Sequence, residues 1–158
     1  MRPMTEGDGS VELERDVKRT PLDVVAYEVD MLRYCFDRLF PFQPSDRHEK
    51  NLLLEGYLLH YRALLEFFAH PKPRATDLSI RRPQDWASRT LSASEIKAIT
   101  DLAEPVHDKW FDMIGKQLAH CTQPRYVDKQ TWPITEMNHA LENVIKAFVQ
   151  LDRVATYR

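Results

Sequence analysis

The side chains with the clearest chemical potential are four polar residues within an otherwise apolar stretch, NLLLEGYLLHYRALLEFF (residues 51–68). On a helical wheel, Asn51, Glu55, Arg62 and Glu66 fall within an arc of about 60°. Asn51 with Glu55 and Arg62 with Glu66 are one turn apart, so each pair can interact along the helix surface. The stripe therefore predicts either a solvated or structural polar seam, or one wall of a charged binding cleft.

Two other titratable residues occupy apolar surroundings. His60 lies nearly opposite the stripe on the same wheel, where a histidine is usually a core residue with one satisfied ring nitrogen. A direct chemical role for His60 is the alternative. Glu28 falls inside the apolar stripe of the preceding predicted helix, which is an unusual place for a carboxylate.

A second polar group is found in KQLAHCTQPR (residues 116–125). Lys116 and His120 are one helical turn apart, and Thr122 and Arg125 follow shortly after. Cationic side chains are favourable at a helix C-terminus, which is the structural interpretation. The functional interpretation is a small site for phosphate or another anion, because lysine, arginine and threonine supply donors together.

Two Glu-x-x-His motifs raise the question of a di-iron centre, because such bundles pair two of these motifs with two further glutamates. The motifs are Glu104/His107 and Glu136/His139, and the further glutamates would be Glu28 and Glu55. However, Glu136 and His139 lie off the apolar stripe of their helix, and Pro105 interrupts the other motif. We therefore expect no metal and no cofactor. No phosphate-binding loop, dinucleotide fingerprint or nucleophile motif is present either.

Composition limits the class of protein. The chain has 158 residues, a formal net charge of −2 and two cysteines, Cys35 and Cys121. The near-neutral charge excludes a large basic footprint for nucleic acid. Neither an apolar run long enough for a membrane nor a signal-peptide core is present, so we expect a cytoplasmic protein with buried, reduced thiols and no membrane partner.

Helical periodicity and only four glycines predict an all-α fold, a bundle of four to five helices. Residues 1–19 are expected to form a flexible arm, and residues 20–158 a single domain. Thr20 and Pro21 begin the first helix, Ser45 caps the second, and Ser92 with Glu95 forms a capping box for the third. Pro105 predicts a kink, or a stop followed by a fourth helix running to about His120. The last helix is expected from about Pro133 to Ala155.

One connection stands apart from the short loops of this bundle. Residues 69–91 contain three prolines and no clear period, and loops of this length tend to be functional, disordered or misassigned. Trp86 is expected to anchor this segment to the bundle.

Residues 51–68 and 116–125, followed by Trp132 and a terminal amphipathic helix, resemble an uncharacterised family of small bacterial all-helical proteins. The resemblance covers about Ser45 to Leu151. It implies that the polar residues of both blocks act together: Asn51, Glu55, His60, Arg62, His120, Thr122 and Arg125. The helix ending in Leu-Ala-His also distantly resembles HEPN-type domains, many of which are RNases with an arginine and a histidine separated by four to six residues. Met113, Ile114 and Gly115 occupy those positions here, so that RNase motif is not intact.

These observations lead to three hypotheses. The favoured one is a non-enzymatic binding or regulatory module. Its site would be a polar cleft between the second helix and the turn at residues 120–125. It would bind another protein or a second copy of itself. The alternative is an HEPN-like, metal-independent RNase of a toxin–antitoxin or phage-defence system, in which RNA is the partner. There His120 would act as general acid and base, and Arg62 or Arg125 would stabilise phosphate. The third is a purely structural subunit.

Overall fold

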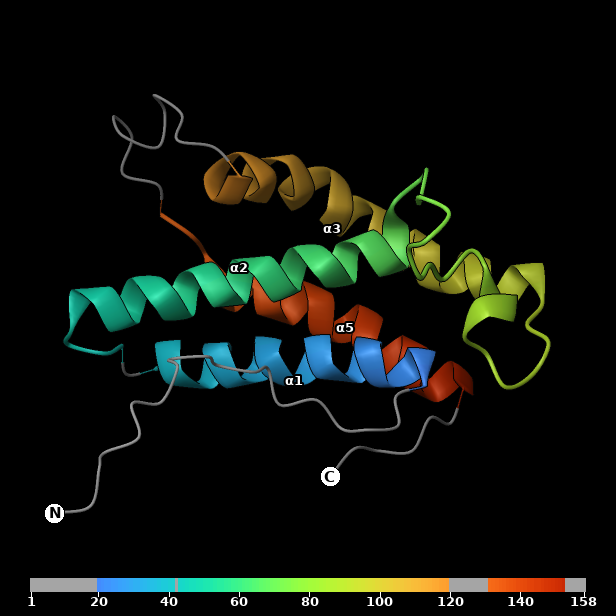
Figure 1. The fold of residues 1–158 in the computed structure, drawn as a ribbon, viewed down its shortest axis with the longest axis horizontal. Helices are drawn as coiled ribbons and strands as arrows, with labels where there is room; N and C mark the ends of the chain where they lie inside the picture. The colour runs from blue at the N-terminus through green and yellow to red at the C-terminus, as the bar shows by residue number, and fades with distance from the viewer. Residues whose placement is uncertain (1–19, 42, 120–130, 153–158) are drawn as a thin grey trace, which may run out of the picture.

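The described part of the chain is a bundle of helices without strands. The computed structural model describes residues 20–41, 43–119 and 131–152 (Figure 1). Four α-helices and one short 3₁₀ turn account for its regular structure, which confirms the all-α prediction. They are α1 (Pro21–Leu39), α2 (Arg47–Ala69), the 3₁₀ turn η1 (Pro83–Asp85), α3 (Ala93–Ala119) and α5 (Ile134–Asp152).

Helix α2 is the central element, and it contacts α1, α3 and α5. Its largest buried side chains include Tyr57 and Tyr61, whose hydroxyls donate to the backbone carbonyls of Ile134 and Met137 in α5. Gly56 allows α1 to approach closely, since a Cβ at this position would lie 3.1 Å from the Sγ atom of Cys35. Three neighbouring helices therefore pack against α2.

One side of α2 nevertheless remains open. Leu52 is 71% exposed and Leu59, two turns later, is 56% exposed. The apolar character of α2 thus extends beyond the surface that its three neighbours cover.

Local capping explains where the helices begin. Thr20 and Asp23 form a capping box at α1, with Pro21 as the first helical residue. Ser92 and Glu95 bond reciprocally at the start of α3, as expected. Hydrogen bonds from Arg89 and then from Ser92 lower the pKa of Glu95 to about 2. The predicted cap of α2 was wrong by one residue: Asp46, not Ser45, accepts the hydrogen bond from the Glu49 backbone.

Of the two alternatives predicted at Pro105, a kink or a stop, the stop was wrong, because α3 continues through this residue as one helix. A proline inside a helix removes one backbone hydrogen bond and costs about 3 kcal/mol. Residues on both sides of it are buried, including Ala103 and Trp110. Packing of both halves against the bundle outweighs the lost hydrogen bond, so four α-helices form where a fifth was possible.

The long connection between α2 and α3 is packed against the bundle rather than free of it. The backbone N–H of Ile80 donates to the carbonyl of Phe67, and the Trp86 indole donates to the carbonyl of Ser79. The Trp86 ring is buried against Phe67 and Phe148. The prediction that Trp86 anchors this segment is confirmed.

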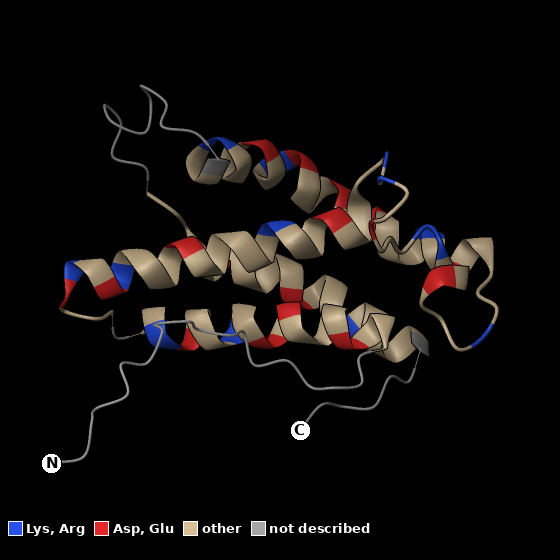
Figure 2. Cartoon of the chain, viewed as in Figure 1, with Lys and Arg blue, Asp and Glu red and all other residues tan. Residues whose placement is uncertain are grey.

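Charges of both signs are interspersed along the helices, as Figure 2 shows. Arg33 of α1 makes a bidentate pair with Glu142 of α5, and this hydrogen bond raises the pKa of the arginine. Within the described residues, no helix is both long and apolar enough to cross a membrane.

Candidate functional site

Most of the predicted polar stripe faces solvent. Asn51, Glu55 and Glu66 are exposed on α2. Arg62 behaves differently, because its guanidinium lies over the Phe111 ring of α3, with Cζ 4.2 Å from the ring centroid. Arg62 is also 3.8 Å from Glu66. Arg62 therefore connects the stripe to a neighbouring helix.

A glycine in α3 makes room for this arginine. A Cβ at position 115 would overlap the Nη1 atom of Arg62, and its three nearest heavy atoms would all belong to Arg62. Gly115 thus permits the guanidinium to lie against the backbone of α3.

His60 and Glu28, which sequence reasoning noted separately, form a pair. The Nδ1 atom of His60 is 2.7 Å from Oε2 of Glu28, so the imidazole donates to the carboxylate. The side chain of His60 is only 10% exposed, and that of Glu28 is 23% exposed. The Tyr27 ring approaches the imidazole edge-on at a centroid distance of 5.9 Å. Glu28 and His60 each lie in the apolar stripe of their own helix, and their hydrogen bond satisfies both polar groups across the α1–α2 contact.

Glu28 also lies on the wall of a cleft of about 370 Å³ between α1, α2 and the connection after α2. Most of the lining is apolar, and its charged members, Glu28, Glu66 and Asp77, are all carboxylates. The complete lining consists of Val24, Val25, Glu28, Ala63, Leu64, Glu66, Phe67, Thr76, Asp77 and Leu78. No lysine, arginine or histidine lines the cleft among the described residues. A cleft of this kind suits a ligand with an apolar body and a positive charge.

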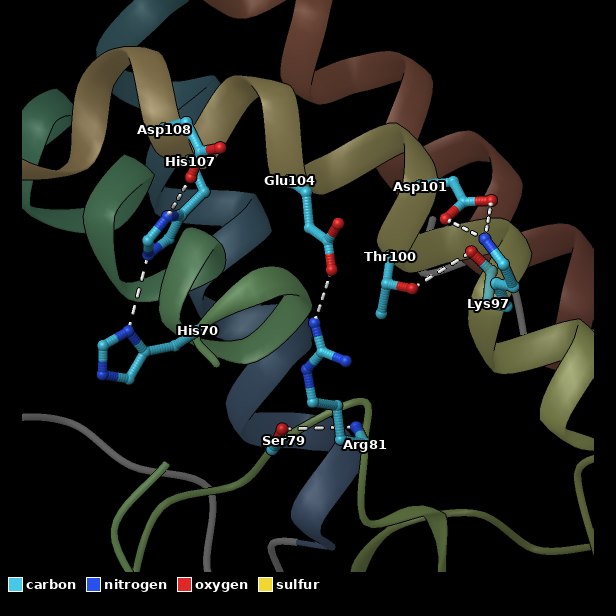
Figure 3. A network of polar contacts seen from close by, with 9 residues as sticks. All are labelled: His70, Ser79, Arg81, Lys97, Thr100, Asp101, Glu104, His107 and Asp108. Carbon is cyan, nitrogen blue, oxygen red and sulfur yellow. Dashed lines mark hydrogen bonds and ion pairs between the residues drawn. The ribbon is translucent and has the colours of Figure 1, made fainter. Parts of the chain in front are cut away.

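A second cluster of titratable residues lies where α2 ends against α3. Figure 3 shows His70 and His107 turned toward each other, with Asp108 beside the other ring nitrogen of His107. The His107 ring stacks on Phe111 at 4.4 Å, and His70 lies 5.3 Å from the same ring. Sequence reasoning missed this pair. Its only signals were the His107 of a Glu-x-x-His motif and a histidine directly before Pro71.

Several predicted site residues are not brought into either cluster. Lys116 is exposed on α3. His120, Thr122 and Arg125 lie outside the described residues, as does Cys121. The expected cleft between α2 and residues 120–125 therefore stays a prediction.

The residues considered for a di-iron centre have other partners. Glu104 pairs with Arg81 at 2.7 Å, Glu136 pairs with Lys109, and Glu28 pairs with His60. Across residues 20–41, 43–119 and 131–152, no group of three or more histidine, cysteine, aspartate or glutamate side chains is arranged to hold a metal ion.

A comparison with protein-family models, curated proteins and solved structures found no match to this chain. The geometry of the two clusters is therefore the basis for assigning a function.

Proposed function

We propose that this protein is a binding module whose ligand site is the cleft between α1, α2 and residues 76–78. The observation that carries this proposal is the position of Glu28. Its Oε2 atom accepts a hydrogen bond from buried His60, while the side chain lies on the wall of the cleft. His60 acts as a positioning residue, because its hydrogen bond fixes the carboxylate at the edge of an apolar surface.

The lining of the cleft indicates the class of ligand. A cation entering it would meet Glu28, Glu66 and Asp77, and charge-assisted hydrogen bonds to carboxylates are the strong ones. The apolar side chains beside them, such as Val25 and Phe67, would cover an alkyl or aromatic body. The ligand that fits is an amine or guanidinium carried on an apolar group, either as a small molecule or as a side chain of a protein partner.

Hexylamine is a suitable probe, with hexanoate as a probe of the same length and opposite charge. We expect hexylamine to shift the amide resonances of Val24, Val25 and Leu78 in a ¹H–¹⁵N spectrum of the full chain, and hexanoate to leave them in place. Equal shifts with both probes would mean that the carboxylates play no part, and would overturn the proposal.

Glu28→Gln is the informative variant, because it keeps the shape and the hydrogen-bonding capacity of the side chain while removing its charge. It should weaken hexylamine binding about tenfold, which corresponds to about 1.4 kcal/mol. Glu49→Gln, an exposed carboxylate in the first turn of α2, is the matched control and should bind as wild type does. Binding that survives Glu28→Gln unchanged would contradict the proposal.

The second candidate function is the metal-independent RNase, with His120 as general acid and base and Arg62 stabilising phosphate. The observation that favours it is that the Arg62 guanidinium lies against Gly115, five positions before His120 in the chain. In this proposal, Arg62 supplies the positive charge that the missing arginine of the HEPN motif would provide.

RNA cleavage in the presence of EDTA tests this second candidate. His120→Ala should abolish cleavage, and Arg62→Gln should lower kcat at least about a hundredfold, as loss of one transition-state donor typically does. His139→Ala, which removes an exposed histidine of α5, is the control. Absence of cleavage by the wild type, or cleavage that survives His120→Ala, would exclude the RNase.

The cellular setting of the proposal is the bacterial cytoplasm. Cys35 is a buried free thiol, and its burial raises the pKa of the thiol. An unreactive reduced cysteine of this kind suits a reducing compartment.

A further inference from the structure

His70 and His107 place two ring nitrogens opposite each other at the junction of two elements. His70 is the C-terminal cap of α2, and His107 belongs to the middle of α3. The distance from Nδ1 of His70 to Nε2 of His107 is 3.4 Å. This distance allows a long hydrogen bond between the two rings, whose direction depends on which ring nitrogens carry protons.

The same separation is the one expected for two ligands of a tetrahedral metal ion. Zinc binds histidine nitrogens at about 2.0–2.1 Å, and the tetrahedral angle then places two such nitrogens about 3.3–3.4 Å apart. We propose that His70 and His107 form a binding site for a divalent transition-metal ion such as Zn²⁺, in which each histidine supplies one ligand.

Asp108 favours the protonation form that this site requires. Its Oδ1 atom lies 3.4 Å from Nδ1 of His107, and the charge of this largely exposed carboxylate favours a proton on that nitrogen. The lone pair of His107 is then on Nε2, which faces His70. A carboxylate behind a metal-binding histidine is the usual outer-shell arrangement, and it raises the basicity of the ligand.

Without metal, His70 donates its Nδ1 proton to His107. When the ion binds, the proton of neutral His70 moves to Nε2, so that both inward-facing nitrogens present lone pairs. No oxidant or reductant is involved, because Zn²⁺ keeps its charge.

The surroundings hold both rings in this orientation. The His107 ring is stacked on Phe111 at an interplanar angle of 18°, and His70 on the same ring at 26°. Arg62 also lies on Phe111, and the charge of Glu66, 3.8 Å away, partly offsets its repulsion of a metal ion. Fixed rings lose little freedom on binding, which favours affinity.

The site is open to solvent or to a ligand. The His107 side chain is 14% exposed, and within the described chain no third protein ligand completes the coordination sphere. Two positions of a tetrahedral ion therefore remain for water or for donor atoms of a bound molecule.

Titration of the metal-free full chain with ZnCl₂ by calorimetry, and with CoCl₂ by visible absorption, tests the proposal. We expect one ion per chain, and a rise in Tm of roughly 5–10 °C at free Zn²⁺ about a hundred times Kd. His70→Gln and His107→Gln should each weaken binding at least tenfold. Asp108→Asn should weaken it about tenfold as an outer-shell effect.

His48→Ala and His139→Ala are the matched controls, because each removes an exposed histidine far from this pair in the sequence. Both should bind Zn²⁺ as the wild type does. Circular dichroism will establish that the glutamine variants are folded. No binding by the wild type, or equal binding by a folded His70→Gln/His107→Gln double variant, would overturn the proposal. Neither result bears on hexylamine binding in the α1–α2 cleft.

Discussion

The two flanks of α2 accommodate a basic side chain in different ways. Toward α1, His60 is almost fully buried and is bonded directly to a carboxylate, Glu28. Toward α3, Arg62 is about a third exposed and rests on an aromatic ring, with its own carboxylate partner at a longer distance of 3.8 Å. The first flank depends on a specific pair, whereas the second depends on stacking and on a glycine that makes room.

The two flanks should respond differently when one member of a contact is removed. A buried polar group that loses its partner leaves an unsatisfied atom, which is costly. A partly exposed guanidinium that loses its aromatic ring can return to water at little cost. We therefore expect the α1 flank, with its fixed carboxylate, to contribute more to folding, and the α3 flank to rearrange more easily.

Tyr57 and Tyr61 provide a reference for both flanks, since they are buried on α2 without any charge. Burial raises the pKa of both hydroxyls well above the ordinary value. Above about pH 10 the tyrosines of the unfolded chain ionise, whereas those of the folded protein stay neutral. The protein therefore has its full stability below about pH 10 and loses stability as the pH rises. Between about pH 10 and 12 the loss should be roughly 2–3 kcal/mol for each tyrosine. Urea unfolding across this range measures it.

Tyr57→Phe/Tyr61→Phe is the control, because it removes both ionising groups. This double variant should be less stable at neutral pH, through two lost hydrogen bonds, but its stability should depend less steeply on alkaline pH. If the unfolding free energy of the double variant depends on alkaline pH as steeply as that of the wild type, other groups are responsible for the loss.

The largest single substitution effect is expected on the α1 flank. His60→Ala leaves both a cavity and a carboxylate without its donor, so the free energy of unfolding should fall by about 2–4 kcal/mol. Glu28→Gln keeps an acceptor at the same place and should cost about 1 kcal/mol or less. Chemical denaturation of the two variants compares their losses in the free energy of unfolding. Equal losses would show that the shape of the pair matters less than its charge.

Arg62→Ala should be milder than His60→Ala. An exposed cation–π contact contributes about 0.5–1 kcal/mol, and the pair with Glu66 adds about 0.5 kcal/mol at most. The unfolding free energy should therefore fall by about 1 kcal/mol. A loss as large as that of His60→Ala would end the distinction between the two flanks.

Gly115→Ala should have the smallest effect, because two contributions oppose each other. Alanine favours the helix by about 1 kcal/mol over glycine, but its Cβ displaces Arg62 from Phe111. In an Arg62→Ala background the overlap is absent, so the same substitution should stabilise the protein by about 1 kcal/mol. A double-mutant cycle measures this coupling. Additive effects would mean that Arg62 does not rest against position 115.

The sequence predicts well what depends on neighbouring residues. The capping boxes at Thr20 and Ser92 are local, and so is the apolar period of α5. The start of α2 was misplaced by one residue because Ser45 and Asp46 are both good caps, and backbone geometry decides between them. At Pro105 a local rule suggested a stop, but buried side chains on both sides decided the outcome.

The candidate sites depend on contacts that no local pattern contains. Glu28 and His60 are 32 residues apart, and His70 and His107 are 37 residues apart. Glu28 and His60 could each be recognised as out of place in its own segment, whereas His70 and His107 were missed. For both pairs, the partner follows only from how the helices pack. The predicted importance of Arg62 came from its stripe, whereas its contact with Phe111 and Gly115 required the structure of α3.

The anchoring of the connection between α2 and α3 has a consequence for how the protein can be cut or extended. Its arginines and prolines suggest a site for trypsin or for an inserted tag. Yet Arg82 donates to the carbonyls of Arg74, Ala75 and Asp77, which ties the loop to itself, and Ser79, Ile80 and Trp86 are buried. A protease needs an extended, accessible backbone, and an insertion needs a backbone that can move apart. Arg81 is exposed, but the turns at residues 79–86 and the buried residues at both ends of this segment restrict its backbone. This segment should therefore resist digestion as a helix of the bundle does, and a fusion placed there should unfold the protein.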